Sequence, residues 1–372
     1  MSAIRVHDID IRVVQRPDPG TAADSRIKGQ SMTHLLRDLV AVSVRSEDGV
    51  VGESLSMGGG AGLAHYLAST LKPMLLGRDV ADREAVWTEM WTNDRLWFTP
   101  QFAIGTMDVA LWDLYGKTHG LGIHELLGTY RTRMPTYASS MTKAHTQEFV
   151  DEALACRERG YQGYKLHVVG APDADIGACQ AVRAAVGDDY PLMMDVVAGY
   201  NDMQALRVGR ALEELGYHWF EEPLSDYNLH GYRRLAQALD IPIAGVESNE
   251  GSLYSMAEYI TSGAVDIVRA DASFKHGVGQ TKKIAALAEA FGLNLEMHTN
   301  TNPLMDAVSL HIACSIGNTE FFEQLVPEQL FDFGVEAPIH IDEEGYAHVP
   351  DGPGHGVALD REVIDRYTVA TL

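Results

Sequence analysis

The periodic spacing of apolar and polar positions changes at about residue 135. Before that point, RVHDIDIRVV alternates like a strand, and LVAVSVRSEDGVVGESL predicts a hairpin with its turn at Asp48-Gly49. Helical patterns follow over ASTLKPML, ADREAVWTEMW and FAIGTMDVALWDLYGKTHG. These patterns predict an N-terminal α+β domain over residues 1–126.

The chain beyond this point alternates strand patterns with amphipathic helices. The eight strand candidates are MPTYASS, YKLHVV, PLMMDVV, YHWFEEP, IPIAGVES, VDIVRADAS, LNLEMHT and EFFEQL. Six helices are expected to end at a glycine, which most easily adopts the left-handed conformation there: Gly160, Gly187, Gly216, Gly263, Gly292 and Gly317. This alternation favours a parallel α/β barrel over residues 127–335. An open doubly wound sheet is the alternative, but no dinucleotide fingerprint supports it.

The remaining residues, 336–372, contain the turn-rich DGPGHG and a strand-like IHIDEEGYAHV. Because eight barrel strands are already accounted for, this tail is expected to pack back on the N-terminal domain.

Charge and cysteine content limit the partners and the compartment. The chain has 29 Lys and Arg against 52 Asp and Glu, a formal net charge of −23. This balance argues against nucleic acid or an anionic membrane as a partner, and an anionic substrate would need local cations. The cysteines have no CxxC spacing, and no signal or membrane-spanning pattern is visible. We therefore expect a cytoplasmic protein.

A titratable residue stands at the end of each strand from the second to the eighth. They are Lys165 and His167, Asp195, Glu221, Glu247, Asp271, His298 and Glu323. Active sites of such barrels lie at the carboxyl ends of the strands. Any one of these residues alone is more often a solvated or capping group, but the whole series favours a site. Period two also places Lys165 and His167 on one strand face, directed into the barrel mouth.

Three of the acids are expected to bind a metal. Asp195, Glu221 and Glu247 on adjacent strands would repel one another without a cation. Oxygen ligands alone favour Mg²⁺, with Mn²⁺ as the alternative, and argue against zinc. Glu222 is a less favoured candidate ligand, because alternation directs it to the opposite strand face from Glu221.

The ends of the next two strands predict a carboxylate–imidazole pair, with an ion pair two residues before it. A carboxylate at Asp271 would orient His298 and make it a stronger base; the alternative is a satisfied buried histidine. Arg269 and Glu296 precede these two residues by two positions on the same strand faces. Because unpaired buried charges are costly, we expect a salt bridge between them.

The motifs YKLH, MMD, FEEP, GVES, RADAS, EMHT and EFFEQ, with the closing PDGPGHGV, together resemble the enolase superfamily and its mandelate racemase subgroup. The resemblance implies a (β/α)7β modified TIM barrel under an α+β capping domain, in which one family strand is commonly replaced by helix. It also implies Mg²⁺, removal of the proton α to a carboxylate, and an assisting role for Glu323. The subgroup usually has Lys-x-Lys where this chain has Lys165-Leu166-His167, so either residue is a candidate second acid or base.

The leading hypothesis is dehydration of an acid sugar, an aldonate or aldarate. Epimerisation, racemisation or lactone cycloisomerisation of a similar hydroxy acid is the alternative. A barrel that only binds a ligand is disfavoured, because every metal and base position is filled. We expect a small-molecule carboxylate substrate and a homo-oligomer. Arg26 and Lys28 are candidates to hold a second carboxylate, and a solvated basic loop is the alternative there.

Overall fold

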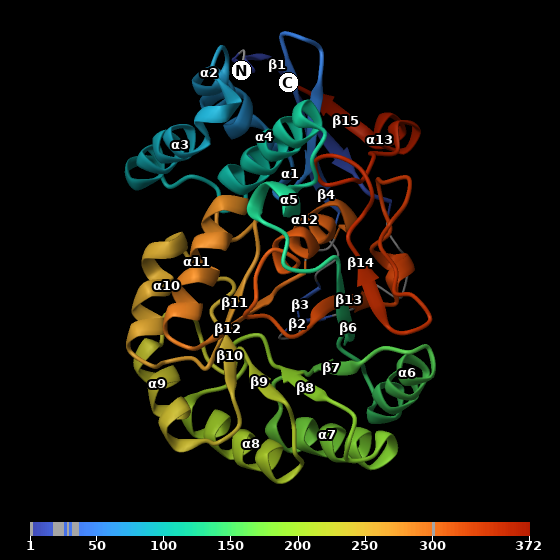
Figure 1. Cartoon of the computed structure of the whole chain (residues 1–372). Coiled ribbons are helices and arrows are strands. Elements are labelled where there is room, and N and C mark those ends of the chain that lie inside the picture. The colour runs from blue at the N-terminus through green and yellow to red at the C-terminus, as the bar shows by residue number, and fades with distance from the viewer. Residues whose placement is uncertain (1–2, 18–25, 28–29, 32–36, 300–301) are drawn as a thin grey trace.

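The computed structural model describes residues 3–17, 26–27, 30–31, 37–299 and 302–372. It consists of a barrel ringed by helices and an α+β capping domain above it (Figure 1). None of the helices in the described part of the chain is both long and apolar enough to cross a bilayer.

The capping domain is an antiparallel sheet with helices packed on one face. The sheet order is β15-β1-β4-β5. Its strands are β1 (Val6–Gln15), β4 (Asp38–Ser46), β5 (Val51–Leu55) and β15 (Thr368–Thr371). The hairpin between β4 and β5 is confirmed, with Arg45 opposite Val51 across the Asp48-Gly49 turn. The helices are α1 (Gly60–Tyr66), α2 (Lys72–Leu75), α3 (Arg83–Trp97), α4 (Ala103–His119) and α5 (Ile123–Leu127).

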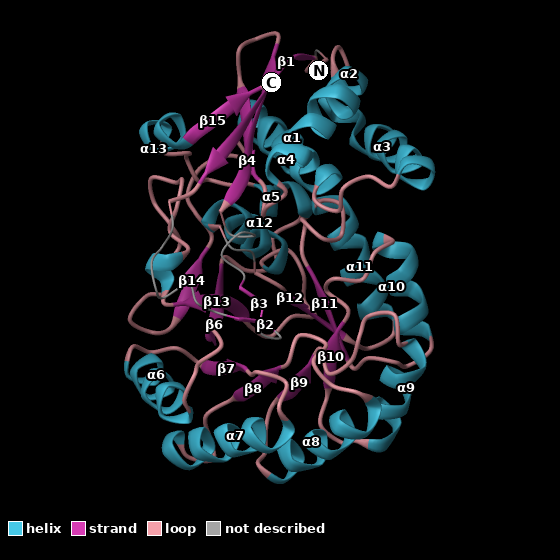
Figure 2. Ribbon diagram, turned by 180° about the vertical axis from the view of Figure 1, so that it is seen from behind, coloured by secondary structure: helices cyan, strands magenta, loops and turns pink. Residues whose placement is uncertain are grey.

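The barrel contains all eight predicted strands, in the order β12-β11-β10-β9-β8-β7-β6-β13. They are β6 (Arg133–Ser140), β7 (Gly163–His167), β8 (Leu192–Asp195), β9 (Trp219–Glu221), β10 (Ile243–Gly245), β11 (Ile267–Ala270), β12 (Asn294–Met297) and β13 (Phe322–Val326). Neighbours along this order pair in parallel. The terminal members β12 and β13 lie side by side, so the sheet closes on itself (Figure 2).

Seven helices connect these eight strands. They are α6 (Thr146–Glu158), α7 (Pro172–Val186), α8 (Asp202–Glu214), α9 (Leu229–Ala238), α10 (Ser252–Thr261), α11 (Val278–Ala290) and α12 (Pro303–Ala313). The (β/α)7β prediction is confirmed. In the described residues after β13, which run without a gap to 372, no eighth barrel helix follows, and all eight barrel strands are present. The strand replacement implied by the resemblance is therefore not found among the described residues.

The chain after β13 contacts both parts of the molecule. Strand β14 (Tyr346–His348) pairs antiparallel with β6 of the barrel. Helix α13 (Arg361–Tyr367) then leads into β15, which pairs with β1 of the capping sheet. The exact domain limits at residues 126 and 335 stay a prediction.

Local sequence signals explain where the barrel helices begin and end. At the start of α8, the Asn201 side chain accepts from the Gln204 amide and the Gln204 side chain accepts from the Asn201 amide, both at 3.0 Å. Five of the six glycines predicted at helix ends have positive φ, at 63° to 100°: Gly160, Gly187, Gly216, Gly263 and Gly292. The prediction was wrong for Gly317, because α12 ends at Ala313 and Gly317 does not have positive φ.

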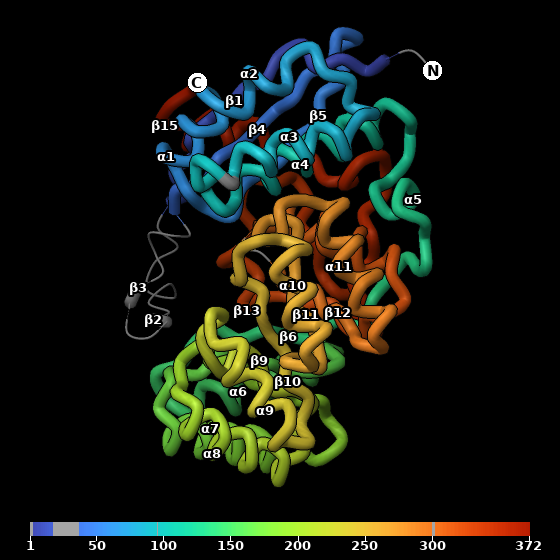
Figure 3. The backbone as a smooth tube through the Cα atoms, turned by 90° about the vertical axis from the view of Figure 1, so that its left-hand side faces the viewer, coloured from blue at the N-terminus to red at the C-terminus, as the bar shows by residue number. Residues whose placement is uncertain are grey.

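The capping domain covers the carboxyl ends of the barrel strands. Helix α4 approaches so closely that a Cβ on Gly105 would lie 2.3 Å from the Ala272 carbonyl oxygen, just after β11. Gln101 donates to the Ser248 carbonyl oxygen, after β10, at 3.0 Å. The tube view shows the capping helices α3 and α4 directly above α10 and α11 of the barrel (Figure 3).

Candidate active site

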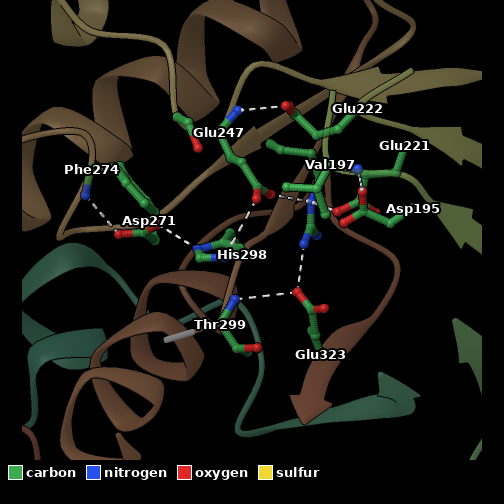
Figure 4. A network of polar contacts seen from close by, with 12 residues as sticks. Asp195, Val197, Glu221, Glu222, Glu247, Asp271, Phe274, His298, Thr299 and Glu323 are labelled. Carbon is green, nitrogen blue, oxygen red and sulfur yellow. Dashed lines mark hydrogen bonds and ion pairs between the residues drawn. The ribbon is translucent and has the colours of Figure 1, made fainter. Parts of the chain in front are cut away.

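Three buried carboxylates meet at the carboxyl ends of adjacent strands (Figure 4). Asp195 and Glu221 are the last residues of β8 and β9, and Glu247 follows β10 by two residues. Each offers one oxygen atom, and these atoms all lie within 4.8 Å of one another. Like charges this close need a cation between or beside them. We call Asp195, Glu221 and Glu247 the carboxylate triad.

Lys165 of β7 is one protein cation beside the triad. Its Nζ lies 2.7 Å from Glu221 Oε1, 2.8 Å from Glu323 Oε1 and 3.8 Å from Asp195 Oδ2. The side chain is 1% exposed. Burial by itself lowers the pKa of Lys165, but Glu221 and Glu323 outweigh burial and raise it well above its ordinary value. Lys165 is therefore an ammonium held among carboxylates.

Arg269 is a second buried cation that contacts the triad. The salt bridge predicted between Arg269 and Glu296 was wrong. Its Nε lies 2.9 Å from Glu221 Oε1 and 3.5 Å from Glu247 Oε2. Its Nη2 lies 2.5 Å from Glu323 Oε2. Arg269 does point into the barrel, but its partners are Glu221 of β9, Glu247 in the loop after β10, and Glu323 of β13.

Glu296 binds backbone instead of a cation. Its carboxylate accepts from the amides of Glu320 at 2.7 Å and Phe321 at 3.1 Å, in the turn that leads into β13. Burial raises the pKa of Glu296 to about 7. These two amides and the Thr319 hydroxyl, which donates to Glu296 Oε2 at 3.2 Å, satisfy the carboxylate without an ion pair. Arg269 therefore binds elsewhere.

His298 and Asp271 form the predicted pair. His298 Nδ1 lies 2.7 Å from Asp271 Oδ2, and Asp271 Oδ1 accepts from the amides of Ser273 at 2.5 Å and Phe274 at 2.9 Å. The fixed carboxylate orients the ring so that Nε2 lies 3.6 Å from Glu247 Oε1. Burial by itself lowers the pKa of His298. The carboxylates of Glu247 and Asp271 outweigh burial and raise this pKa to about 9. A cation bound at Glu247 would oppose that increase.

His167 contacts the other end of the triad. Its Nδ1 donates to the Ser140 carbonyl oxygen at 2.6 Å, and its Nε2 lies 3.0 Å from Asp195 Oδ2. Burial and Lys165 lower the pKa of His167, but Asp195 outweighs them and raises it. His167 and Lys165 thus share a strand face, and the two imidazoles flank the triad at Asp195 and at Glu247.

Glu323 lies deeper in the barrel than its expected place at a strand end. It is the second residue of β13, which continues to Val326. Besides Lys165 and Arg269, it accepts from the Thr299 amide at 3.3 Å. Burial opposes ionisation, but Lys165 and Arg269 hold the pKa of Glu323 well below its ordinary value. This ionised carboxylate balances the two buried cations.

Arg26 and Lys28 are the two residues expected to hold a second carboxylate, and no side-chain contact of either is described. The backbone of Arg26 lies in β2 (Arg26–Ile27), which pairs with β3 (Gln30–Ser31). The Arg26 side chain and the whole of Lys28 lie outside the described residues.

The triad fits a hard divalent cation. All three donors are carboxylate oxygens, as Mg²⁺ prefers. Glu247 Oε2 is buried and has no hydrogen-bond partner among the described residues, and burial raises the pKa of Glu247 to about 7. A cation there would satisfy this oxygen. Glu222 lies outside the triad, and its carboxylate faces backbone amides.

Comparison with known proteins identifies the family. Residues 148–363 match the family described as "Enolase C-terminal domain-like", and residues 14–128 match the family "Mandelate racemase / muconate lactonizing enzyme, N-terminal domain". The chain belongs to the mandelate racemase/muconate lactonizing enzyme family. This match confirms the resemblance to the mandelate racemase subgroup that the sequence motifs indicated. It also confirms the predicted capped-barrel fold.

Relatives in this family carry different names. L-talarate/galactarate dehydratase of Salmonella typhimurium is 33% identical over 347 residues, covering 90% of this chain and 83% of the relative. D-galactarolactone cycloisomerase of Agrobacterium fabrum is 27% identical over 395 residues, covering 99% and 98%. The crystal structure of D-glucarate dehydratase from Agrobacterium tumefaciens, complexed with magnesium, has a TM-score of 0.89 and 32% identity, covering 99% of this chain and 100% of that chain.

Two further contacts of the site were not expected from the sequence. Trp219 Nε1 donates to Glu221 Oε2 at 2.8 Å, and the Ser140 carbonyl oxygen fixes the His167 ring. Trp219 precedes Glu221 by two residues in one strand, so period two could have indicated the first contact. The second depends on where β6 ends beside β7, which no side-chain pattern encodes.

Proposed function

We propose that this member of the mandelate racemase/muconate lactonizing enzyme family removes the proton α to the carboxylate of an acid sugar and eliminates the β-hydroxyl as water. The observation that carries the proposal is the pair of imidazoles flanking the triad. His298 is oriented by Asp271 and His167 by the Ser140 carbonyl oxygen. Each presents Nε2 beside a carboxylate that faces the shared metal position.

The chain's own residues account for the proton transfers. His298 Nε2 takes the α-proton, and the electron pair of the Cα–H bond moves onto the substrate carboxylate to give an enediolate. This electron pair then returns to form the Cα–Cβ double bond. The Cβ–O bond breaks, and the departing hydroxyl leaves as water with a proton from His167 Nε2. The enol product then rearranges to a 2-keto acid. When bound to Asp195, Glu221 and Glu247, Mg²⁺ would stabilise the charge that develops on the substrate carboxylate.

The test is a panel of aldonates, aldarates and their lactones, assayed with Mg²⁺ in D₂O. Deuterium uptake at Cα detects proton abstraction without turnover, and 2-keto acid formation detects dehydration. The proposal is rejected if no compound on the panel exchanges its α-proton.

Cycloisomerisation or epimerisation is a second candidate. It is favoured by the full-length similarity to D-galactarolactone cycloisomerase and by imidazoles at both ends of the triad, since either reaction can use bases on two substrate faces. Product analysis separates the reactions, because only dehydration yields a 2-keto acid.

Metal removal provides a direct prediction. Treatment with EDTA should abolish α-proton exchange, and Mg²⁺ should restore it. Glu221→Gln should weaken Mn²⁺ binding, measured by electron paramagnetic resonance, by at least about 100-fold, because even outer-shell changes cost 10- to 100-fold. Asp173→Asn, which removes one exposed carboxylate, is the matched control. Unchanged Mn²⁺ affinity in Glu221→Gln would remove Glu221 from the ligand set.

The roles of Lys165 and His167 can be separated. His167→Gln should abolish turnover while α-proton exchange continues, because His298 still takes the proton. Lys165→Met should weaken substrate binding and slow both processes, because it removes the ammonium beside Glu221 and Glu323. Turnover and exchange are measured in parallel. Normal turnover in His167→Gln, with loss of exchange on one face in Lys165→Met, would instead identify Lys165 as the second base.

A further inference from the structure

The loop after β10, Val246–Asn249, carries the third member of the triad. We call these four residues the Glu247 loop. Strand β10 ends at Gly245, so the ladder of the sheet does not fix Glu247 itself. Val246 has φ 71°, a left-handed conformation that β-branched residues rarely adopt. A strained backbone of this kind persists only where its surroundings over-determine it.

On the amide side, one carboxylate oxygen holds the loop. Glu222 Oε1 accepts from the amide of Val246 and, at 3.2 Å, from the amide of Glu247 (Figure 4). Glu222 is 3% exposed. Its own carbonyl oxygen accepts from the Ala198 amide at 2.7 Å, in the loop after Asp195. Glu222 therefore connects the loops or strand ends of all three triad members.

On the carbonyl side, an ammonium holds the same loop. Lys275 Nζ donates to the carbonyl oxygens of Val246 at 2.8 Å and Asn249 at 2.6 Å. The Lys275 side chain is fully buried, and its own carbonyl oxygen accepts from Ser252 Oγ at 2.9 Å. A buried carboxyl group and a buried ammonium thus bind the two polar sides of the Glu247 loop.

We infer that Glu222 and Lys275 are positioning residues that clamp the Glu247 loop in its metal-binding conformation. The inference rests on the proposed metal-dependent function. Neither side chain joins the triad. Each acts on backbone atoms, so that the Glu247 carboxylate already faces Asp195 and Glu221 before a cation binds. Pre-organised ligands bind more tightly because less ordering accompanies binding.

The first test measures Mn²⁺ affinity by electron paramagnetic resonance. Glu222→Leu removes the acceptor of both amides, and Lys275→Met removes the donor to both carbonyls. Each should raise the Kd for Mn²⁺ by about 10- to 100-fold, the range for outer-shell partners. Glu222→Gln keeps the Oε1 acceptor and should bind close to the wild-type value. Glu250→Gln, on an exposed residue beside the loop, and Lys283→Met, on α11, control for loss of charge.

The second test measures amide hydrogen exchange of the peptide over residues 243–251 in metal-free protein. Exchange should be faster in Glu222→Leu and Lys275→Met than in wild type, with Glu222→Gln close to wild type. Wild-type affinity and wild-type exchange in both disruptive variants would overturn the clamp. If wild-type protein binds no Mn²⁺, the proposed function fails, and the exchange rates still decide whether the clamp exists. If Glu222→Gln is as impaired as Glu222→Leu, the backbone-acceptor role is wrong.

Discussion

Replacing His298 with asparagine should lower turnover and α-proton exchange by about 10²- to 10⁴-fold, the usual contribution of a positioned acid–base group. The substitution removes Nε2, the atom 3.6 Å from Glu247 Oε1, and leaves the triad in place. Mn²⁺ affinity should therefore change little. The measurement is exchange in D₂O with the best compound of the substrate panel, together with Mn²⁺ titration.

The chain offers a matched control for this variant. His348 forms a pair with Asp342 at the same 2.7 Å, but its side chain is 54% exposed and lies on β14, outside the site. His348→Asn should have wild-type exchange. Asp271→Asn should resemble His298→Asn, and the double variant should be little worse than either, because the two residues act as one unit. Wild-type exchange in His298→Asn would eliminate it as the base.

Replacing Arg269 with methionine should destabilise the metal-free protein by about 3–5 kcal/mol, the cost of removing one partner from a buried ion pair. Arg269 is fully buried and lies beside Glu221, Glu247 and Glu323. Without it, Lys165, His167 and His298 would have to offset four acids that lie close together. Urea unfolding followed by circular dichroism measures the change.

Divalent metal should reverse part of this loss, because it neutralises two of the same carboxylates. Saturating Mg²⁺ is therefore expected to raise the urea midpoint more in Arg269→Met than in wild type. Arg207→Met is the control, since Arg207 pairs with Asp173 where both side chains are mostly exposed, and such pairs contribute at most about 1 kcal/mol. Equal stability of Arg269→Met and wild type would show that the acids are already neutralised by protonation.

Much of the barrel could be predicted from the sequence because its signals are local. Strand and helix periods differ, and each αL glycine or capping box involves residues within a few positions of one another. A repeat of 24 to 27 residues, which corresponds to one strand–helix unit, separates the residues predicted at the strand ends: Asp195, Glu221, Glu247, Asp271, His298 and Glu323. Parallel strands bring their carboxyl ends to one rim, so the meeting of the triad followed from strand order alone.

Partner choice across the barrel was decided only by the tertiary structure. Period two correctly placed Arg269 inside the barrel, but alternation gives a face and no distance. The closure of the sheet brings β13 beside β12, so Glu323 comes within reach of the guanidinium. Meanwhile the turn before β13 offers two amides to Glu296. Neither contact depends on neighbours in the sequence.

The loop after β10 also separates what the sequence determined from what the tertiary structure decided. The sequence by itself determined that Glu247 would follow a strand at the barrel mouth, because the apolar run IPIAGV is local. It did not determine that Val246 would adopt a left-handed conformation, nor that Glu222 and Lys275 would hold it from two sides. These contacts join loops after three different strands, and their geometry is fixed only when the barrel closes and its buried polar groups must find partners.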